Sequence, residues 1–295
     1  MSICPNRGKG WLFVVTEAQT VYVDDSGSDS KSRIITAAFC VSTVEKWQRF
    51  ERRWRNISVN AGFKHFHMTE FAACKQEKPC HQCVRGETAL EQHPWRRWTP
   101  KKRRNVLRQL AETIVEFVDY GAGLAYTKQD FDEHIRTSEV QLYTNEPVAQ
   151  EYFTYAVQRC GGELAKWRAQ QSTVNPPLNF VFDLTPKKGR DDIAKVFFGG
   201  VSGKPQYLDG IEQWFIPESV SYESRKDVIQ LLSADMLAWV TATIRAREVF
   251  GRGETLEMFQ IADIFVDTNN IRMGHTPKES FERWERDFLN AKQTG

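Results

Sequence analysis

Three aspartates stand where carboxylates could do chemistry. Asp24 ends the segment QTVYVD at 19–24, Asp183 ends LNFVFD at 178–183, and Asp235 lies within the apolar run LLSADMLAWV. An ionised carboxylate among apolar side chains is costly unless it is paired or coordinates a metal. Carboxylates gathered without a cation repel one another, and one of them tends to stay protonated. The position of Asp235 therefore predicts that a positive group meets its carboxylate.

Each of these aspartates also has a plainer interpretation. Asp183 could merely end a strand, and Asp235 could be neutralised by Arg225, by Arg245 or by a backbone amide. Asp25 follows Asp24 and begins Asp-Ser-Gly, which is also a good turn sequence. These alternatives stay open on the sequence alone.

Several segments together resemble the domain of unknown function 3800 family (DUF3800). YVDDSG at 22–27, FHMTEF at 66–71 and SYESRKDVIQLLSADMLAW at 221–239 are similar, in this order, to its Tyr-x-Asp-Glu-Ser-Gly, Phe-His-x-x-Glu and Gln-x-Ala-Asp signatures, and VFDL at 181–184 is similar to its middle strand. Two departures affect the surroundings of the aspartates: Asp25 replaces a Glu, and Leu232 replaces the Gln, with Gln230 two positions earlier. The family is regarded as ribonuclease H-like. The resemblance therefore implies an α/β (α+β) fold with a mixed central sheet flanked by helices.

The resemblance also implies a function, a metal-dependent nuclease that hydrolyses phosphodiester bonds through its Asp cluster. Two divalent cations held by shared carboxylates activate water and stabilise the transition-state charge, and Mg²⁺ or Mn²⁺ suits such oxygen ligands. Asp24 would bridge both ions, and Asp183 and Asp235 would each complete one site. His67 and Glu70 match the family's His and Glu. Glu70 would be a further metal ligand, and His67 would handle a proton or contact a phosphate. The alternative for His67 is a packed, hydrogen-bonded histidine. The alternative function is a non-catalytic nucleic-acid- or partner-binding module of the same fold.

A cysteine-rich stretch predicts a second, structural site. Cys74, Cys80, Cys83 and His93 form C-x5-C-x2-C-x9-H, which could hold one tetrahedral Zn²⁺, with His81 as an alternative ligand. Only the Cys80-x2-Cys83 spacing is typical of zinc sites. The other cysteines are expected to be thiols within the core.

A basic segment, WRRWTPKKRR at 95–104, indicates contact with nucleic acid. Cationic side chains neutralise phosphates and indoles stack on unpaired bases. The candidate residues are Arg96, Arg97, Trp98, Lys101, Lys102 and Arg103. The alternative is a solvated helix start whose tryptophans anchor the loop to the core. The sequence does not distinguish RNA, DNA and hybrid partners.

The elements that must position these residues suggest a single domain over 1–295. We expect a core over about 19–250, a Cys-rich insertion over about 72–98 and a C-terminal helical extension over about 251–295. The predicted strands are 19–24, 34–41, 178–183 and 211–216, with a further one at GAGLAYTK. The predicted helices are 43–60, from Thr99-Pro100 to Tyr120, 147–170, 189–198, 226–249 and 277–291, while 63–71 is expected to be a short strand or turn.

Bulk composition narrows the class of protein. The chain has 295 residues, 41% of them hydrophobic and 26% charged, which suits a globular protein with a sizeable core. No apolar run approaches the ~20 residues of a membrane span, and six cysteines are too few for a disulfide scaffold of this size. The formal net charge of +2 does not by itself indicate nucleic acid. We therefore expect a cytoplasmic protein.

Overall fold

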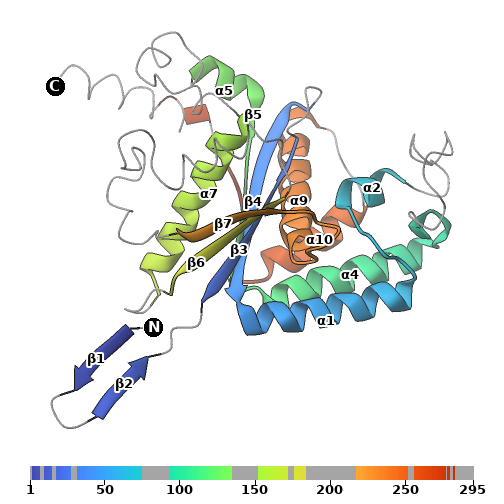
Figure 1. Cartoon of the computed structure of the whole chain (residues 1–295). Helices are drawn as coiled ribbons and strands as arrows, with labels where there is room; N and C mark the ends of the chain where they lie inside the picture. Colours follow the sequence, from blue (N-terminus) through green and yellow to red (C-terminus); the bar gives the residue numbers. More distant parts are fainter. Residues whose placement is uncertain are drawn as a thin grey trace.

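A computed structural model describes most of the chain: residues 2–6, 10–14, 18–27, 32–74, 94–134, 152–171, 176–183, 217–251 and 256–276, with 278, 279 and 282. Within these ranges a mixed sheet of six strands runs in the order β7-β6-β3-β4-β5-β8 (Figure 1). Its strands are β3 (Gln19–Ser26), β4 (Ile34–Thr43), β5 (Tyr120–Thr127), β6 (Leu178–Asp183), β7 (Pro217–Glu223) and β8 (Ile271–His275). A separate antiparallel pair, β1 (Ser2–Asn6) and β2 (Gly10–Val14), precedes it.

The directions of the strands decide which residues can meet. β3, β4 and β5 are antiparallel neighbours, whereas β6 runs parallel to β3 and β7 runs parallel to β6. The carboxyl ends of β3, β6 and β7 therefore lie at the same edge of the sheet. Asp24 and Asp183 are brought to this edge, and the segment after β7 begins there.

Helices cover both faces of the sheet (Figure 1). They are α1 (Val44–Ala61), α2 (Met68–Ala73), η1 (Pro94–Arg97), α4 (Pro100–Phe117), α5 (Lys128–His134), α7 (Tyr152–Ala169), α9 (Leu231–Phe250) and α10 (Leu256–Val266). α9 packs on β3, β4 and β5 from one side, with α1, α4 and α10 beyond it, and α7 packs on β4 and β5 from the other. The predicted mixed central sheet flanked by helices is confirmed.

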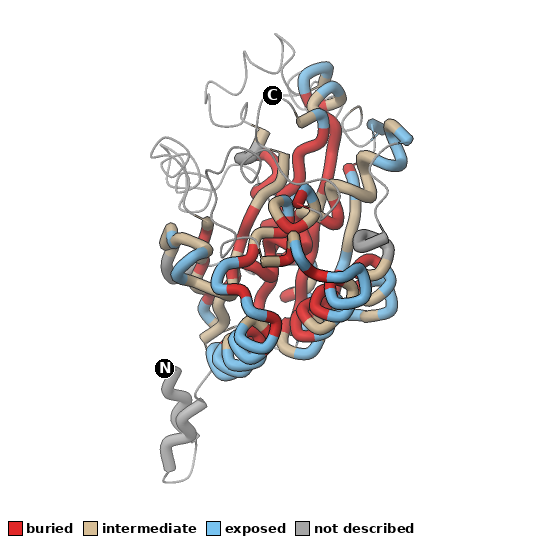
Figure 2. The backbone as a smooth tube through the Cα atoms, turned by 90° about the vertical axis from the view of Figure 1, so that its right-hand side faces the viewer, coloured by how far each residue is buried: buried red, intermediate tan, exposed pale blue. Residues whose placement is uncertain are grey.

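The core is divided by β4, which is buried on both faces. Ala38 and Cys40 belong to the cluster on the α9 side, while Ala37, Phe39 and Val41 belong to the cluster on the α7 side. This alternation is the two-residue period of a strand, and it explains why the strand reads as a continuous apolar run. Figure 2 shows buried backbone through the centre of the molecule and exposed residues along the outer sides of the helices.

Several predicted elements are confirmed and others are shifted. The strands at 19–24, 34–41 and 178–183 are present, and GAGLAYTK lies almost wholly in β5. Thr99 caps α4, Thr43 caps α1, and Gly62, with φ of 82°, ends α1. The neighbouring Ser42 hydroxyl donates to the Phe117 carbonyl oxygen at 2.7 Å.

Three expectations about elements are corrected. Residues 68–73 form a helix rather than a strand or turn, and the His67 side chain caps it by accepting from the Thr69 amide. α9 begins at Leu231 instead of 226, because 225–230 form turns. The region after residue 250 is not purely helical, since β8 pairs with β5 and joins the central sheet. α7 confirms most of the helix expected at 147–170, whose first residues, 147–151, lie outside the described residues. The predicted helix at 189–198, the strand at 211–216 and most of the helix expected at 277–291 also lie outside them.

Candidate active site

Asp24 and Asp183 lie on neighbouring parallel strands at one sheet edge. The register pairs Val23 with Phe182, so the next residue on each strand is an aspartate. Asp24 is buried, with 3% of its surface exposed, and the side chain of Asp183 is 16% exposed. The pairing of β3 with β6 therefore joins two carboxylates that are far apart in the sequence.

Asp235 approaches the same edge from α9. It lies on the helix's second turn and is 3% exposed. Its Oδ2 accepts a hydrogen bond of 2.8 Å from the backbone amide of Met68, at the start of α2. α9 can lie close to the sheet because β5 carries Gly123, where a Cβ atom would stand 2.3 Å from Thr241 Oγ1. A backbone amide is one of the partners that the sequence allowed for Asp235.

Arg225 lies among the three aspartates. It is two residues beyond the end of β7, in the turn that leads to α9. Its Nη2 is 2.8 Å from Asp183 Oδ2, and its Nη1 is 3.6 Å from both Asp24 Oδ2 and Asp235 Oδ1. Its backbone amide also donates to Asp183 Oδ1 at 3.3 Å. Three carboxylates from β3, β6 and α9 thus share one guanidinium.

The electrostatics of this cluster are uneven. Burial, reinforced by the charge of Asp235, raises the pKa of Asp24 well above its usual value, although Arg225 lowers it. Asp24 Oδ1 accepts from the Asp25 backbone amide at 2.8 Å, while its buried Oδ2 has no hydrogen-bond partner. Burial lowers the pKa of Arg225, but the charges of the surrounding aspartates outweigh it and raise that pKa. One guanidinium does not balance three ionised carboxylates, so the cluster favours either a proton retained by Asp24 or a further positive charge.

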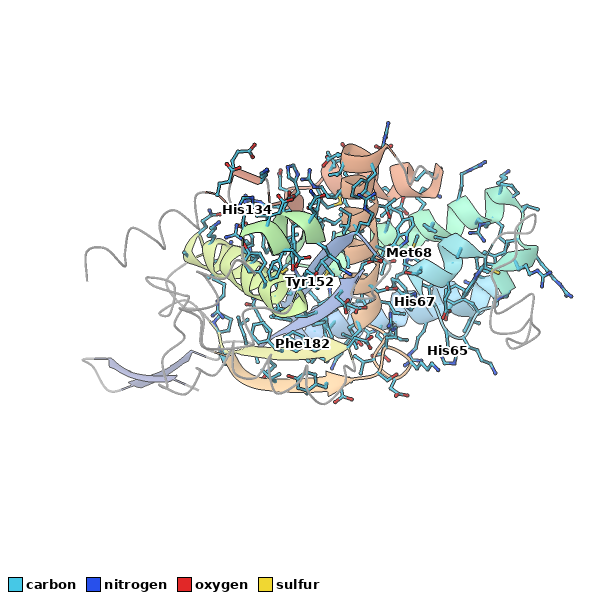
Figure 3. The ribbon with its side chains drawn as sticks, turned by 90° about the horizontal axis from the view of Figure 1, so that it is seen from above. His65, His67, Met68, His134, Tyr152 and Phe182 are labelled. Atoms are coloured by element: carbon cyan, nitrogen blue, oxygen red, sulfur yellow. The ribbon has the colours of Figure 1, made fainter. Side chains whose placement is uncertain are left out.

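His67 borders the cluster. It is the N-cap of α2, and its Nδ1 accepts from the Thr69 amide at 3.1 Å. Because Nδ1 acts as the acceptor, the proton of the neutral ring lies on Nε2, and this atom is 4.0 Å from Asp235 Oδ1. Figure 3 shows His67 and Met68 on the α9 side of the sheet, opposite Tyr152 of α7. Glu70 lies in the first turn of α2, and Asp25 follows Asp24 in β3.

The oxygen atoms of the cluster are the type of ligand that a hard divalent cation prefers, but they are not spaced to bind one. The aspartates offer only oxygen atoms, as Mg²⁺ and Mn²⁺ prefer, and Asp24 Oδ2 accepts no hydrogen bond. Within the described part of the chain, no three His, Cys, Asp or Glu side chains stand close enough to hold a metal ion. The Arg225 guanidinium lies among the oxygens that would have to converge.

The cysteine-rich stretch lies largely beyond the described structure. Cys80, Cys83, His81 and His93 lie outside the described residues, so the zinc site stays a prediction. Cys74 is fully buried at the end of α2. Cys40 and Cys160 are buried thiols, as expected for core cysteines. Burial raises the pKa of Cys40 to about 12, which keeps that thiol protonated.

The basic segment divides into buried and exposed residues. Trp98 is 6% exposed and packs against Phe63, Phe71 and Trp95, and Arg103 is 5% exposed. The expectation that they contact nucleic acid is corrected, because neither can reach an external ligand. Four candidates keep solvent access: Arg97, Lys101 and Lys102 are exposed and Arg96 is partly exposed.

Arg103 has a structural task. Its guanidinium donates to the carbonyl oxygens of Phe71 at 2.6 Å, Cys74 at 3.0 Å and Trp95 at 3.3 Å. It therefore joins the end of α2 to η1 on either side of residues 75–93. Helical spacing could have revealed this, because Arg103 shares a face with Leu107 and Leu110.

Comparisons with known proteins give a likeness of fold. The chain resembles ribonuclease HII in its complex with PCNA from Archaeoglobus fulgidus, with a TM-score of 0.38 and 11% identity over 88% of this chain and 92% of that one. It also resembles ribonuclease H2 from Pyrococcus horikoshii OT3, with a TM-score of 0.36 and 11% identity over 81% of each chain. At these values the likeness carries nothing about activity. No protein-family model and no curated protein sequence matches the chain. Among the described residues, no helix is long and apolar enough to cross a membrane.

Proposed function

We propose that this chain is a metal-dependent nuclease in which Asp24, Asp183 and Asp235 hold Mg²⁺ or Mn²⁺. One observation carries the proposal: carboxylates from two strands and a helix, two of them 3% exposed, converge on a single shared cation. Burying charge in this way costs folding free energy, so such a cluster is more typical of a functional site than of a scaffold. The motif resemblance to DUF3800 agrees with this assignment, and we propose membership of that family.

The chain's own residues divide the work. A divalent cation bound by the aspartates would activate water and neutralise charge on the phosphate. The Met68 amide holds Asp235 in place, and the Asp25 amide holds Asp24. The Thr69 amide fixes the ring of His67, so that its Nε2 proton faces the cluster and serves as the proton donor. Asp25 and Glu70 would supply further ligands.

The exposed cations near the start of α4 would position the substrate. Arg97, Lys101 and Lys102 are solvent-exposed, and such side chains neutralise backbone phosphates. Because both tryptophans of the segment are buried, they offer no stacking platform for unpaired bases. The partner would therefore be recognised by its phosphates, and the described residues of the segment favour no base sequence.

A second candidate function is a binding module without turnover. The observation that favours it is the ion pairing itself, because Arg225 already offsets part of the cluster's negative charge. The fold would then be retained with a neutralised site, as a scaffold for nucleic acid or for a partner.

Cleavage assays separate the two functions. Labelled single-stranded, duplex and hybrid oligonucleotides are incubated with the full chain in Mg²⁺, Mn²⁺ or EDTA. We expect metal-dependent cutting that falls roughly a hundredfold or more in Asp24→Asn, Asp183→Asn and Asp235→Asn. Asp263→Asn, an exposed aspartate of α10, is the matched control and should cut normally. A folded wild-type chain that binds these oligonucleotides but cuts none of them in any metal would reject the nuclease in favour of the binding module.

A further inference from the structure

Arg225 is held unequally by its three partners. Only the contact to Asp183, at 2.8 Å, has the length of a charge-assisted hydrogen bond, while the contacts to Asp24 and Asp235 are both 3.6 Å. Asp24 Oδ2, one of these distant atoms, has no hydrogen-bond partner at all. The guanidinium is therefore anchored on one side of the cluster and only loosely attracted on the other.

The surroundings of Arg225 let its side chain leave the cluster without unfolding the site. The side chain is 29% exposed, against 2% for Asp24 and 4% for Asp235. Its backbone is fixed separately, because its amide donates to Asp183 Oδ1 at 3.3 Å. A rotation of the side chain towards solvent would leave the turn and all three carboxylates in place.

We propose that Arg225 is a resident cation that a divalent metal ion must displace, and that the displaced guanidinium then binds the phosphate of the substrate. This inference rests on the proposed metal-dependent function and adds a competitor and a substrate ligand to the same site. The proposal also explains why, among the described residues, the three carboxylates are not spaced to bind a metal ion. They surround the wide, planar guanidinium of Arg225, whereas a divalent metal ion is small and spherical.

The two halves of the proposal follow from charge. A guanidinium and a divalent ion between the same carboxylates repel each other strongly in a poorly hydrated site. The displaced side chain stays tethered beside Asp183, at the exposed side of the cluster. A guanidinium there matches a phosphate with two parallel hydrogen bonds, a geometry that lysine lacks. Metal binding would thus create the phosphate site that substrate needs.

Binding of Mn²⁺ alone tests the competition. Titration of the full chain, followed by calorimetry and by the electron paramagnetic resonance of free Mn²⁺, compares wild type, Arg225→Gln and Arg225→Lys. We expect Arg225→Gln to bind Mn²⁺ at least roughly tenfold more tightly, since the ion no longer breaks a charge-assisted contact. Arg52→Gln, an exposed arginine of α1, controls for the loss of one positive charge and should match wild type.

The outcomes discriminate between the inference and the function on which it rests. If Arg225→Gln binds Mn²⁺ no more tightly than wild type, the competition is refuted while the metal site stands. If neither protein binds Mn²⁺, or if Asp24→Asn binds it as well as wild type does, the proposed function itself fails. If Arg225→Gln does not fold in EDTA, Arg225→Lys is used in its place. We expect this variant to bind Mn²⁺ severalfold more tightly than wild type, because lysine lacks the planar guanidinium that contacts the carboxylates. An unchanged affinity for Mn²⁺ would count against the competition.

Oligonucleotide binding tests the second half. Fluorescence anisotropy of a labelled duplex is measured in EDTA and in Ca²⁺, with wild type and Arg225→Gln. In EDTA the two should bind alike, because the guanidinium is engaged with carboxylates. In Ca²⁺ wild type should bind the duplex roughly tenfold more tightly than the variant, which corresponds to the gain of one charge-assisted hydrogen bond. Equal affinities in Ca²⁺ would reject the phosphate role and leave Arg225 as a competitor only.

Discussion

Arg103 and Arg225 are two shielded cations with opposite kinds of partner. Arg103 is 5% exposed and donates to three neutral carbonyl oxygens at 2.6 to 3.3 Å. Arg225 has a side chain 29% exposed and faces three carboxylates, only one of them within 3 Å. The three carbonyl oxygens carry no net charge and all accept from the guanidinium, so the first arrangement has no excess negative charge. The second has excess negative charge and a partly exposed side chain, and this contrast is the reason why we propose a functional role for Arg225 and a structural one for Arg103.

The largest effect is expected on removing the structural cation. Arg103→Met leaves three inward carbonyl oxygens without their donor, at a cost of about 3 to 5 kcal/mol in the free energy of unfolding. Urea unfolding in EDTA and in Mn²⁺ measures it, and Mn²⁺ should not restore the loss. Arg108→Met, an exposed arginine of the same helix, should cost less than about 0.5 kcal/mol. If Mn²⁺ raised the free energy of unfolding of Arg103→Met but not that of Arg225→Gln, the proposed contrast between the two arginines would be wrong.

Removing exposed cations from the same basic run should weaken binding but not stability. We expect the double variant Arg97→Ala/Lys101→Ala to bind a labelled duplex roughly tenfold more weakly, with a reduced dependence of affinity on salt. Trp98→Phe, altered within the core, should instead lose stability and keep its affinity. Anisotropy titrations at several salt concentrations, with thermal unfolding of each protein, check both halves. Weakened duplex binding by Trp98→Phe at unchanged stability would reverse the assignment.

A smaller effect concerns the charge of Asp24. Its pKa is raised in the folded chain by burial first and by Asp235 second. As pH rises above the ordinary carboxyl pKa, the unfolded chain loses this proton before the folded chain does, so wild type loses stability until the folded pKa is passed. In EDTA, Asp24→Asn should match the stability of wild type near pH 4 and be the more stable of the two proteins near pH 8. Chemical unfolding across this range checks the sign, and parallel curves for the two proteins would contradict it.

The smallest effect separates two roles of His67. His67→Ala removes the cap of α2 and should cost about 0.5 to 1 kcal/mol of stability, whereas His67→Asn keeps a capping oxygen and should cost little. Both variants lose the Nε2 proton and should cleave more slowly. Thermal unfolding and cleavage rates measured in parallel distinguish capping from chemistry. If His67→Asn is as unstable as His67→Ala, the cap contributes nothing.

The three aspartates could be identified as candidates from the sequence because of their local surroundings. Asp235 stands in an apolar helix, and Asp24 and Asp183 end strands that are easily identified by their β-branched and aromatic residues. The resemblance implied that they meet. The parallel pairing of β3 with β6 that brings Asp24 and Asp183 together could not be predicted from any spacing. Caps such as Thr99 and Gly62 were likewise predictable, because capping is local.

What depends on tertiary pairing could not be predicted. Arg225 and Arg245 were equal candidates to neutralise Asp235, and only the path of the chain after β7 selects Arg225; Arg245 lies near the far end of α9 and pairs with Glu248. β8, with the sequence IRMGH, has too little alternation to be recognised and is defined by its pairing with β5. The buried position of Trp98 depends on the aromatic cluster around it, which is assembled from separate segments.

The order of the residues along the chain has a consequence for synthesis. A protein is made from its N-terminus and can begin to fold as it emerges. Asp24 and Asp183 emerge first, Arg225 follows, and Asp235 emerges after it. The counter-charge is thus present before the last carboxylate, so the nascent domain never has to gather three bare aspartates. The same order keeps the cluster incomplete until α9 has been made, and an unfinished chain therefore carries no assembled carboxylate cluster.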